Sequence, residues 1–135
     1  MILVDTNIVV DVVTGDADWS TWSASALETA AARDKLAIND IDYAELAAGY
    51  EEPEALHVSL DGLGLPLIRI PVAALFLAGQ AFRQYRRAGG TRSSVLADFF
   101  IGAHAAVTGA ALLTRDTRRI RSYFPTVALV APDSD

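Results

Sequence analysis

Residues 1–7 read MILVDTN, four apolar residues that run directly into an aspartate, a threonine and an asparagine. The run Ile2–Val4 is too short to cross a membrane or to form the apolar part of a secretory signal, so it predicts a short buried strand. Asp5 then follows the carboxyl end of that strand. In open α/β sheets, ligands bind at this end of the strands. The stretch therefore predicts an α/β fold with a functional site that begins at Asp5.

The composition predicts one compact domain with a sizeable apolar core. The chain has 135 residues, of which 52% are hydrophobic, and its mean hydropathy is +0.28. We expect the domain to span residues 1–132 and residues 133–135 to form a frayed tail. With no cysteine in the sequence, a metal site must use oxygen or imidazole ligands. We find no signal or membrane segment, which predicts a cytoplasmic protein with no membrane partner.

The charges are divided unevenly along the chain, whose formal net charge is −6. Residues 1–68 carry 13 acidic and 2 basic residues, whereas residues 69–121 carry 9 arginines and only 2 acids. The net charge alone would argue against a nucleic-acid partner, but the basic second half removes that objection.

Short apolar runs alternate with helical patterns, which predicts a parallel sheet covered by helices on both faces. The helical patterns lie at Trp22–Lys35, Val72–Ala88 and Phe99–Thr108, where apolar or small residues recur close to every 3.6 positions. The five expected strands are Ile2–Val4, Leu36–Ile38, Leu67–Ile70, Ala110–Leu113 and Val127–Val130.

Acidic residues follow several of these strands or begin the next helix, so they are expected to gather at one end of the sheet. Clustered carboxylates repel one another, and a divalent cation relieves that repulsion. Oxygen ligands favour Mg²⁺, which can activate water for attack on a phosphate. The acids in question are Asp5, Asp40, Asp42, Glu45, Asp98 and Asp116.

Each acid also has a purely structural interpretation. Asp5, Asp98 and Asp116 are each followed by an expected helix and could cap it, and Glu45 could be a first-turn residue favoured by the helix dipole. For a single acid, we regard capping as the better interpretation. Four acids at one sheet end favour the metal site.

Four motifs in this order resemble the PIN-domain ribonucleases, specifically the VapC-type toxins of type II toxin–antitoxin pairs. They are VDTN at 4–7, AEL at 44–46, ADFFIGAHA at 97–105 and LLTRD at 112–116. The resemblance implies a three-layer α/β/α sandwich around a central, mostly parallel five-stranded sheet. It also implies an endoribonuclease dependent on Mg²⁺ or Mn²⁺, a cognate VapB-type antitoxin as partner, and a homodimer.

The resemblance assigns roles by position. Asp5, Asp98 and Asp116 match metal ligands of the family, and the catalytic set is completed by Glu45 and Thr114. Asp40 and Asp42 remain alternatives for the role given to Glu45. Thr6 and Asn7, which match the polar pair after the first aspartate, are expected to contact substrate. We expect metal-activated water to cut RNA, leaving a 5′-phosphate and a 3′-hydroxyl.

The arginines and histidines have competing interpretations. Arg115 and Arg118 flank Asp116 and are the expected phosphate contacts, although arginines here could equally form a solvated face. His57 and His104 are expected to be structural, because neither has a metal-binding partner at suitable spacing.

Other protein classes fit less well. A HAD-like phosphatase needs a second aspartate at the position of Asn7, and a receiver domain needs a late lysine, whereas the only lysine is Lys35. A dinucleotide-binding fold needs a third glycine where Leu67 stands. The main alternative from another class is a non-catalytic PIN-like module that binds nucleic acid or protein; a DNA-directed nuclease is the nearer enzymatic one.

Overall fold

The computed structural model of the protein describes residues 1–132. A four-stranded parallel sheet lies at the centre of the molecule. The strands are β1 (Ile2–Val4), β2 (Leu36–Ala37), β3 (Ala111–Leu113) and β4 (Leu129–Val130), in the order β2-β1-β3-β4. In the register of the sheet, Leu3 lies between Ala37 and Leu112. The tail expected at 133–135 lies outside the described residues.

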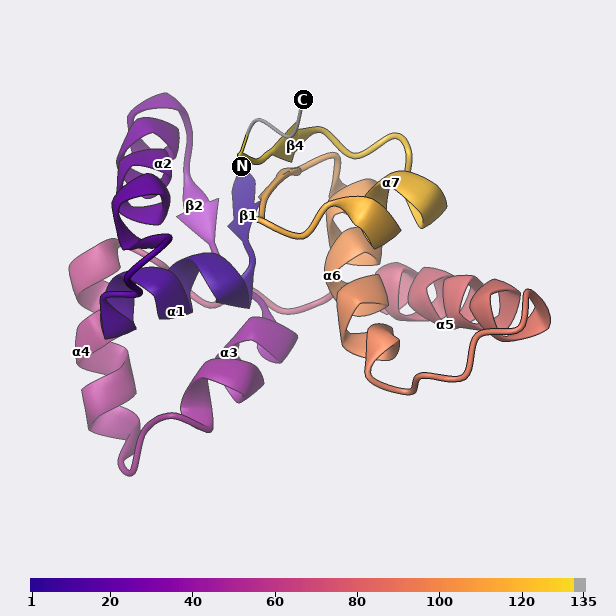
Figure 1. The fold of residues 1–135 in the computed structure, drawn as a ribbon, viewed down its shortest axis with the longest axis horizontal. Coiled ribbons are helices and arrows are strands. Elements are labelled where there is room, and N and C mark those ends of the chain that lie inside the picture. Colours follow the sequence, from indigo (N-terminus) through magenta and orange to yellow (C-terminus); the bar gives the residue numbers. More distant parts are fainter. Residues whose placement is uncertain (133–135) are drawn as a thin grey trace.

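Helices cover both faces of the sheet, as Figure 1 shows. The α1–α4 helices lie on one side, and α5–α7 lie on the other. None of them is long and apolar enough to cross a membrane within the described part of the chain. Their bounds are α1 Thr6–Thr14, α2 Ser20–Arg33, α3 Asp40–Ala47, α4 Pro53–Leu63, α5 Val72–Arg87, α6 Val95–Thr108 and α7 Arg118–Tyr123.

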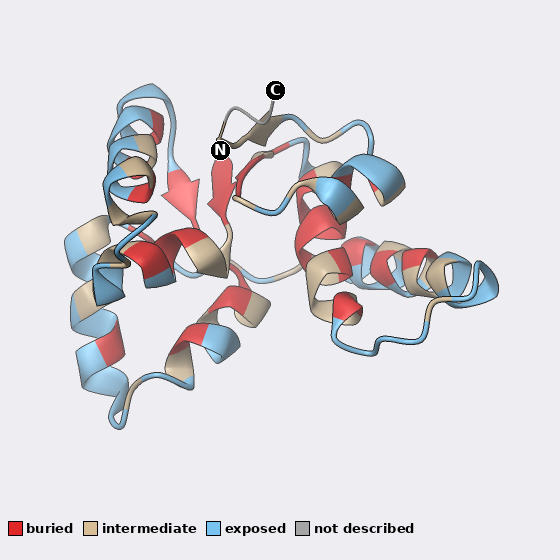
Figure 2. Ribbon diagram, viewed as in Figure 1, coloured by how far each residue is buried: buried red, intermediate tan, exposed pale blue. Residues whose placement is uncertain are grey.

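The alternation of side chains along β1 divides the core into two halves. Ile2 and Val4 pack in the half formed with α1–α4, whereas Leu3 packs with α5–α7. Successive strand residues point to opposite faces, so a strand buried on both faces is apolar throughout. Figure 2 shows buried residues in β1, β2 and α6, whereas β4 is only partly buried. The expected α/β/α sandwich is confirmed.

The expected number of strands was wrong, because the described residues form four strands and not five. Leu67–Ile70 contributes only an isolated parallel bridge, between Ile38 and Leu67. Pro66 and Pro71 flank this segment and lack the N–H groups that a continuous ladder needs. The segment therefore runs along the edge of the sheet without extending it.

Two helix starts near the expected site also differ from the sequence pattern. The α6 helix begins at Val95, so Asp98 lies inside its first turn and does not precede it. The α3 helix begins at Asp40, which places Glu45 in the second half of that helix. Asp40 and Asp42 interrupt the apolar pattern in the first turn of α3, and at α6 the apolar residues Val95–Ala97 belong to the helix although the expected pattern began only at Phe99.

Small residues on α6 allow it to pack closely against α7. Gly102 is buried, and a β-carbon at this position would overlap the ring of Phe124. The ring of Phe99, one turn earlier, contacts Phe124 and Tyr123 edge-on, with centroids 6.1 and 4.8 Å away. This packing fixes α6, the helix that carries Asp98.

A Gly102→Ala substitution is therefore expected to lower the free energy of unfolding by about 1–3 kcal/mol, because the added methyl group overpacks the α6–α7 contact. Gly79→Ala is the matched control. Gly79 lies inside α5 with no atom within 4 Å of an added β-carbon, so alanine should stabilise the helix by up to ~1 kcal/mol. Urea unfolding of both variants measures the difference. Equal effects at the two positions would contradict the packing described.

Candidate active site

Besides Asp11, four acids from separate segments line one open cleft at the carboxyl ends of β1 and β3. Asp5 follows β1, Glu45 comes from α3, Asp98 from α6, and Asp116 from the loop after β3. We call these residues the four cleft acids. The cleft has a volume of about 310 Å³ and is lined by Asp5, Thr6, Asn7, Val10, Asp11, Glu45, Asp98, Arg115 and Asp116.

Asp5 is both a helix cap and a member of the cleft. Its Oδ1 accepts the backbone N–H of Thr6 (2.7 Å), which caps α1, and its Oδ2 accepts the Thr114 hydroxyl (2.7 Å). The pKa of Asp5 is raised to about 6, mainly by burial. The charges of Asp98 and Glu45 add to the rise, and the two hydrogen bonds oppose it. Asp5 therefore caps α1 and lines the cleft at the same time, so its structural interpretation does not exclude a functional one.

Thr114 forms hydrogen bonds to two of the cleft acids, Asp5 and Asp116. Its side chain is fully buried, and its hydroxyl, which donates to Asp5, also accepts the backbone N–H of Asp116 (3.0 Å). The Asn7 amide adds a long contact to Asp5 (3.4 Å), and its oxygen accepts the backbone N–H of Arg115 (3.3 Å). These contacts make Thr114 and Asn7 positioning residues.

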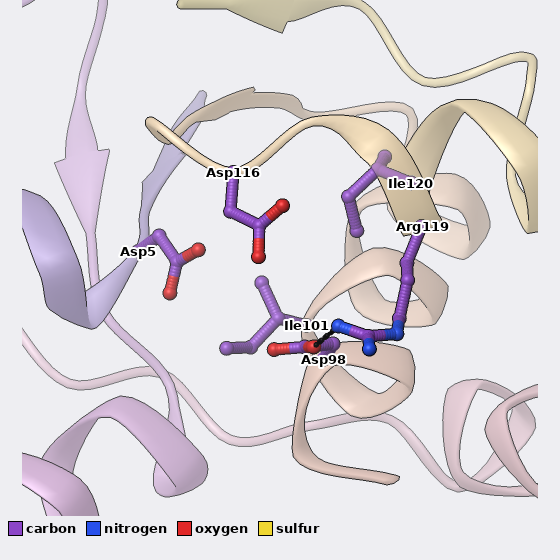
Figure 3. Close-up of a pocket in the computed structure, with 6 residues that line it drawn as sticks. All are labelled: Asp5, Asp98, Ile101, Asp116, Arg119 and Ile120. Carbon is purple, nitrogen blue, oxygen red and sulfur yellow. Dashed lines mark hydrogen bonds and ion pairs between the residues drawn. The ribbon is translucent and has the colours of Figure 1, made fainter. Parts of the chain in front are cut away.

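Asp98 is paired with an arginine in the same pocket. Its Oδ2 accepts Nη1 of Arg119 at 3.0 Å, and Figure 3 shows both side chains beside Asp5 and Asp116. Burial raises the pKa of Asp98, Arg119 opposes the rise, and the charge of Asp116 adds to it. Sequence reasoning did not single out Arg119, because its partner Asp98 lies 21 residues away in the chain. Asp98 and Asp116 make no side-chain cap, unlike Asp5.

The structure separates the three acids of the α3 region. Glu45 reaches the cleft and accepts the Thr6 hydroxyl at 2.7 Å. Asp40 does not line the cleft and pairs with Arg69. Asp42 is fully buried beneath Thr6 and forms a capping box with Asn39. Glu45 is thus the acid of this helix that can meet a ligand.

Arg115 is held by a buried partner that sequence reasoning missed. Its Nε and Nη2 donate to Asp11 at 2.7 and 2.9 Å, and its guanidinium lies over the ring of Trp19, 4.9 Å from the centroid. The side chain of Asp11 is 3% exposed, and it also accepts the Ser23 hydroxyl. The available signal was a lone aspartate within the apolar run of α1, since a buried charge needs a partner. Arg118 is exposed.

The donor set of the cleft suits a hard cation. The ligands on offer are carboxylate, hydroxyl and amide oxygens, the atoms that Mg²⁺ and Mn²⁺ prefer. Burial is the main reason that the pKa values of Asp5 and Asp98 are raised, and a bound cation would favour the charged forms that burial disfavours. As the side chains stand, no three acidic or histidine residues among the described residues are close enough to hold one ion together. The chemistry of the residues fits such an ion, which can be held by one or two carboxylates with water as its other ligands.

The sequence of residues 2–124 matches the family model described as PIN domain. The chain belongs to the PIN-domain family. The match covers α1–α7 and the motifs that carry the four cleft acids. No curated protein matched the sequence.

Solved structures share this PIN fold over nearly the whole chain. VapBC2 from Rickettsia felis, bound to a DNA fragment from their promoter, has a TM-score of 0.74 and 25% identity, covering 98% of this chain and 100% of that one. A toxin–antitoxin complex from Klebsiella pneumoniae gives 0.67 and 24%, covering 100% of both chains. VapBC-1 from nontypeable Haemophilus influenzae gives 0.72 and 18%, covering 97% and 98%.

Proposed function

We propose that this PIN domain is a Mg²⁺- or Mn²⁺-dependent endoribonuclease that acts as the toxin of a toxin–antitoxin pair. The observation that carries the proposal is the convergence of four acids from distant segments on one cleft with only oxygen ligands. Clustered carboxylates repel one another, and a bound cation relieves that repulsion.

The residues of the cleft have different proposed roles. Asp5, Asp98 and Asp116 would hold the cation, which supplies positive charge that lowers the pKa of the attacking water and stabilises the scissile phosphate. Thr114 orients Asp5 and the Asp116 backbone, and Thr6 orients Glu45. Water would attack the phosphorus without using the RNA 2′-hydroxyl. The bond from phosphorus to the 3′-oxygen would break, and the products would carry a 5′-phosphate and a 3′-hydroxyl.

The proposed toxin role rests on the solved structures that share this fold. The Klebsiella structure is a toxin–antitoxin complex, and the Rickettsia structure is VapBC2 bound to promoter DNA, each matching over the whole length of the compared chain. We therefore propose a VapB-type antitoxin as partner, and a homodimer as the oligomeric state. The exposed Arg118, on the helix after Asp116, is the proposed phosphate contact.

The test is cleavage of matched RNA and DNA oligonucleotides by the purified, antitoxin-free chain. We expect cleavage of RNA with Mg²⁺ or Mn²⁺, no cleavage with EDTA, and loss of cleavage in a folded Asp98→Asn variant. Sequencing of the ends should find 5′-phosphates. Expression of the wild type should arrest growth, whereas Asp98→Asn should not.

Each other outcome points to a different conclusion. Cyclic-phosphate ends would contradict water attack, and preferential cutting of DNA would make the chain a DNA-directed nuclease. If folded and metal-loaded protein binds RNA without cutting it, the chain is a non-catalytic binding module.

A further inference from the structure

We propose that Asp42 is a neutral carboxylic acid that donates a hydrogen bond to Thr6, and that this donation keeps the Thr6 hydroxyl directed at Glu45. Asp42 is thus a positioning residue for the cleft, although it does not line it. The assignment concerns where one proton resides, and it does not depend on the proposed RNA cleavage.

The first argument is a count of protons around Thr6. Its Oγ1 lies 2.7 Å from Glu45 Oε1 and 3.1 Å from Asp42 Oδ1. A threonine hydroxyl has one proton to donate, and an ionised carboxylate has none. Two ionised carboxylates would therefore compete for a single proton. A second proton, on one of the two carboxyl groups, satisfies both contacts.

Burial decides which carboxyl group carries that proton. Asp42 is 0% exposed, whereas Glu45 is exposed at the cleft. Removal from water disfavours the charged form, so the buried member of a closely placed pair is the one that is neutral. The pKa of Asp42 is accordingly raised well above its ordinary value, by burial first and then by the charge of Asp5. The Thr6 proton is then free for the shorter contact, to Glu45.

The other side of Asp42 supplies no positive charge. Its Oδ2 accepts the backbone N–H of Asn39 at 3.0 Å. Asn39 Oδ1 accepts the N–H groups of Ile41 and Asp42, so its Nδ2 faces Nδ1 of His104 at 3.1 Å. That ring nitrogen must be the acceptor, which makes His104 a neutral imidazole, and burial lowers its pKa.

The remaining titratable neighbours do not change this balance. Asp5 at the end of β1 and Glu45 on the same helix are acids, which favour the neutral form of Asp42. On α4, which packs against α3, His57 bonds the Tyr43 hydroxyl instead. A line of hydrogen bonds thus runs from Asp42 through Thr6 to the cleft.

The first experiment follows the side-chain carboxyl carbon of Asp42 by NMR in the wild-type chain with EDTA, assigned through bonds to its own amide. At about pH 5, an aspartate of ordinary pKa, about 3.9, is ionised. We expect Asp42 to keep the shift of a protonated acid there, and Asp40 to be ionised. An ionised Asp42 at this pH would overturn the proposal without any variant.

The second experiment compares melting temperatures of Asp42→Asn and wild type between about pH 4 and pH 8. Asparagine can replace a neutral acid here, since its oxygen can accept from Asn39 and its amide can donate to Thr6. An acid with a raised pKa loses stabilising free energy as the pH rises, and asparagine does not. The melting temperature of the variant relative to wild type should therefore rise with pH.

Asp40→Asn is the matched control, two residues away on the same helix. Burial alone would raise the pKa of Asp40, but the Ile70 N–H and Arg69 lower it below its ordinary value. An acid with a lowered pKa contributes its stability above the unfolded pKa and loses it as the pH falls. The relative melting temperature of this variant should thus fall slightly between about pH 4 and pH 5 and stay level above that. If Asp42→Asn follows the same direction as Asp40→Asn, Asp42 is charged and the proposal is wrong.

Discussion

Replacing Asp5 by asparagine is expected to abolish RNA cleavage and, in metal-free buffer at pH 8, to raise the free energy of unfolding by about 1–2 kcal/mol. The loss of activity should exceed about 100-fold, because the variant removes a charge at the centre of the cleft. The gain in stability has a separate cause. Asp5 is ionised at pH 8 although burial holds its pKa at about 6.

The pH dependence identifies that cause. The pKa of Asp5 rises from 3.8 in the unfolded chain to about 6 in the folded one, so its stabilising contribution is complete below about pH 4 and disappears as the pH rises through 6. The difference corresponds to about 3 kcal/mol. Asparagine caps a helix as well as aspartate does, but it cannot accept from both Thr6 and Thr114, which offsets part of the gain.

Asp116→Asn is the control for this prediction. Asp116 belongs to the same cleft but is exposed, so its replacement should remove cleavage without changing the unfolding free energy beyond ±0.5 kcal/mol. Chemical denaturation with EDTA at pH 4 and pH 8 measures both variants. An Asp5→Asn chain whose stability relative to wild type is the same at both pH values would refute the burial argument.

Replacing Arg115 by methionine is expected to lower the free energy of unfolding by about 3–5 kcal/mol. The substitution leaves Asp11 buried and without its charged partner, since its side chain is only 3% exposed. The double variant Asp11→Leu/Arg115→Met should recover most of the loss, because apolar residues can replace a buried ion pair at little cost. Urea unfolding at pH 7 checks both results. A single variant as stable as wild type would contradict the structural role of this pair.

Arg118→Ala separates substrate contact from stability. Arg118 is exposed on α7, so alanine should leave the unfolding free energy unchanged and weaken RNA binding, with a salt dependence reduced by about one unit of slope. Cleavage-inactive Asp98→Asn protein is the background for these binding titrations. An unchanged slope would remove Arg118 from the phosphate contacts.

The sequence by itself determined the family, the layered architecture and the identity of the four cleft acids as candidates. These features are local: an apolar run such as Ile2–Val4 that ends at a polar residue specifies both a buried strand and the position of Asp5 at its end. The strand expected at Leu67–Ile70 was wrong, because an apolar run between two prolines does not reveal whether it forms a full hydrogen-bond ladder with its neighbour.

Only the tertiary structure decided how the polar residues are shared between the cleft and the core. Asp40, Asp42 and Glu45 are close in sequence, yet one pairs with Arg69, one is buried under Thr6 and one faces the cleft. The partnerships of Arg119 with Asp98 and Arg115 with Asp11 span 21 and 104 residues. Periodicity does not encode such contacts, because they depend on which loops and helix ends the packed sheet brings together.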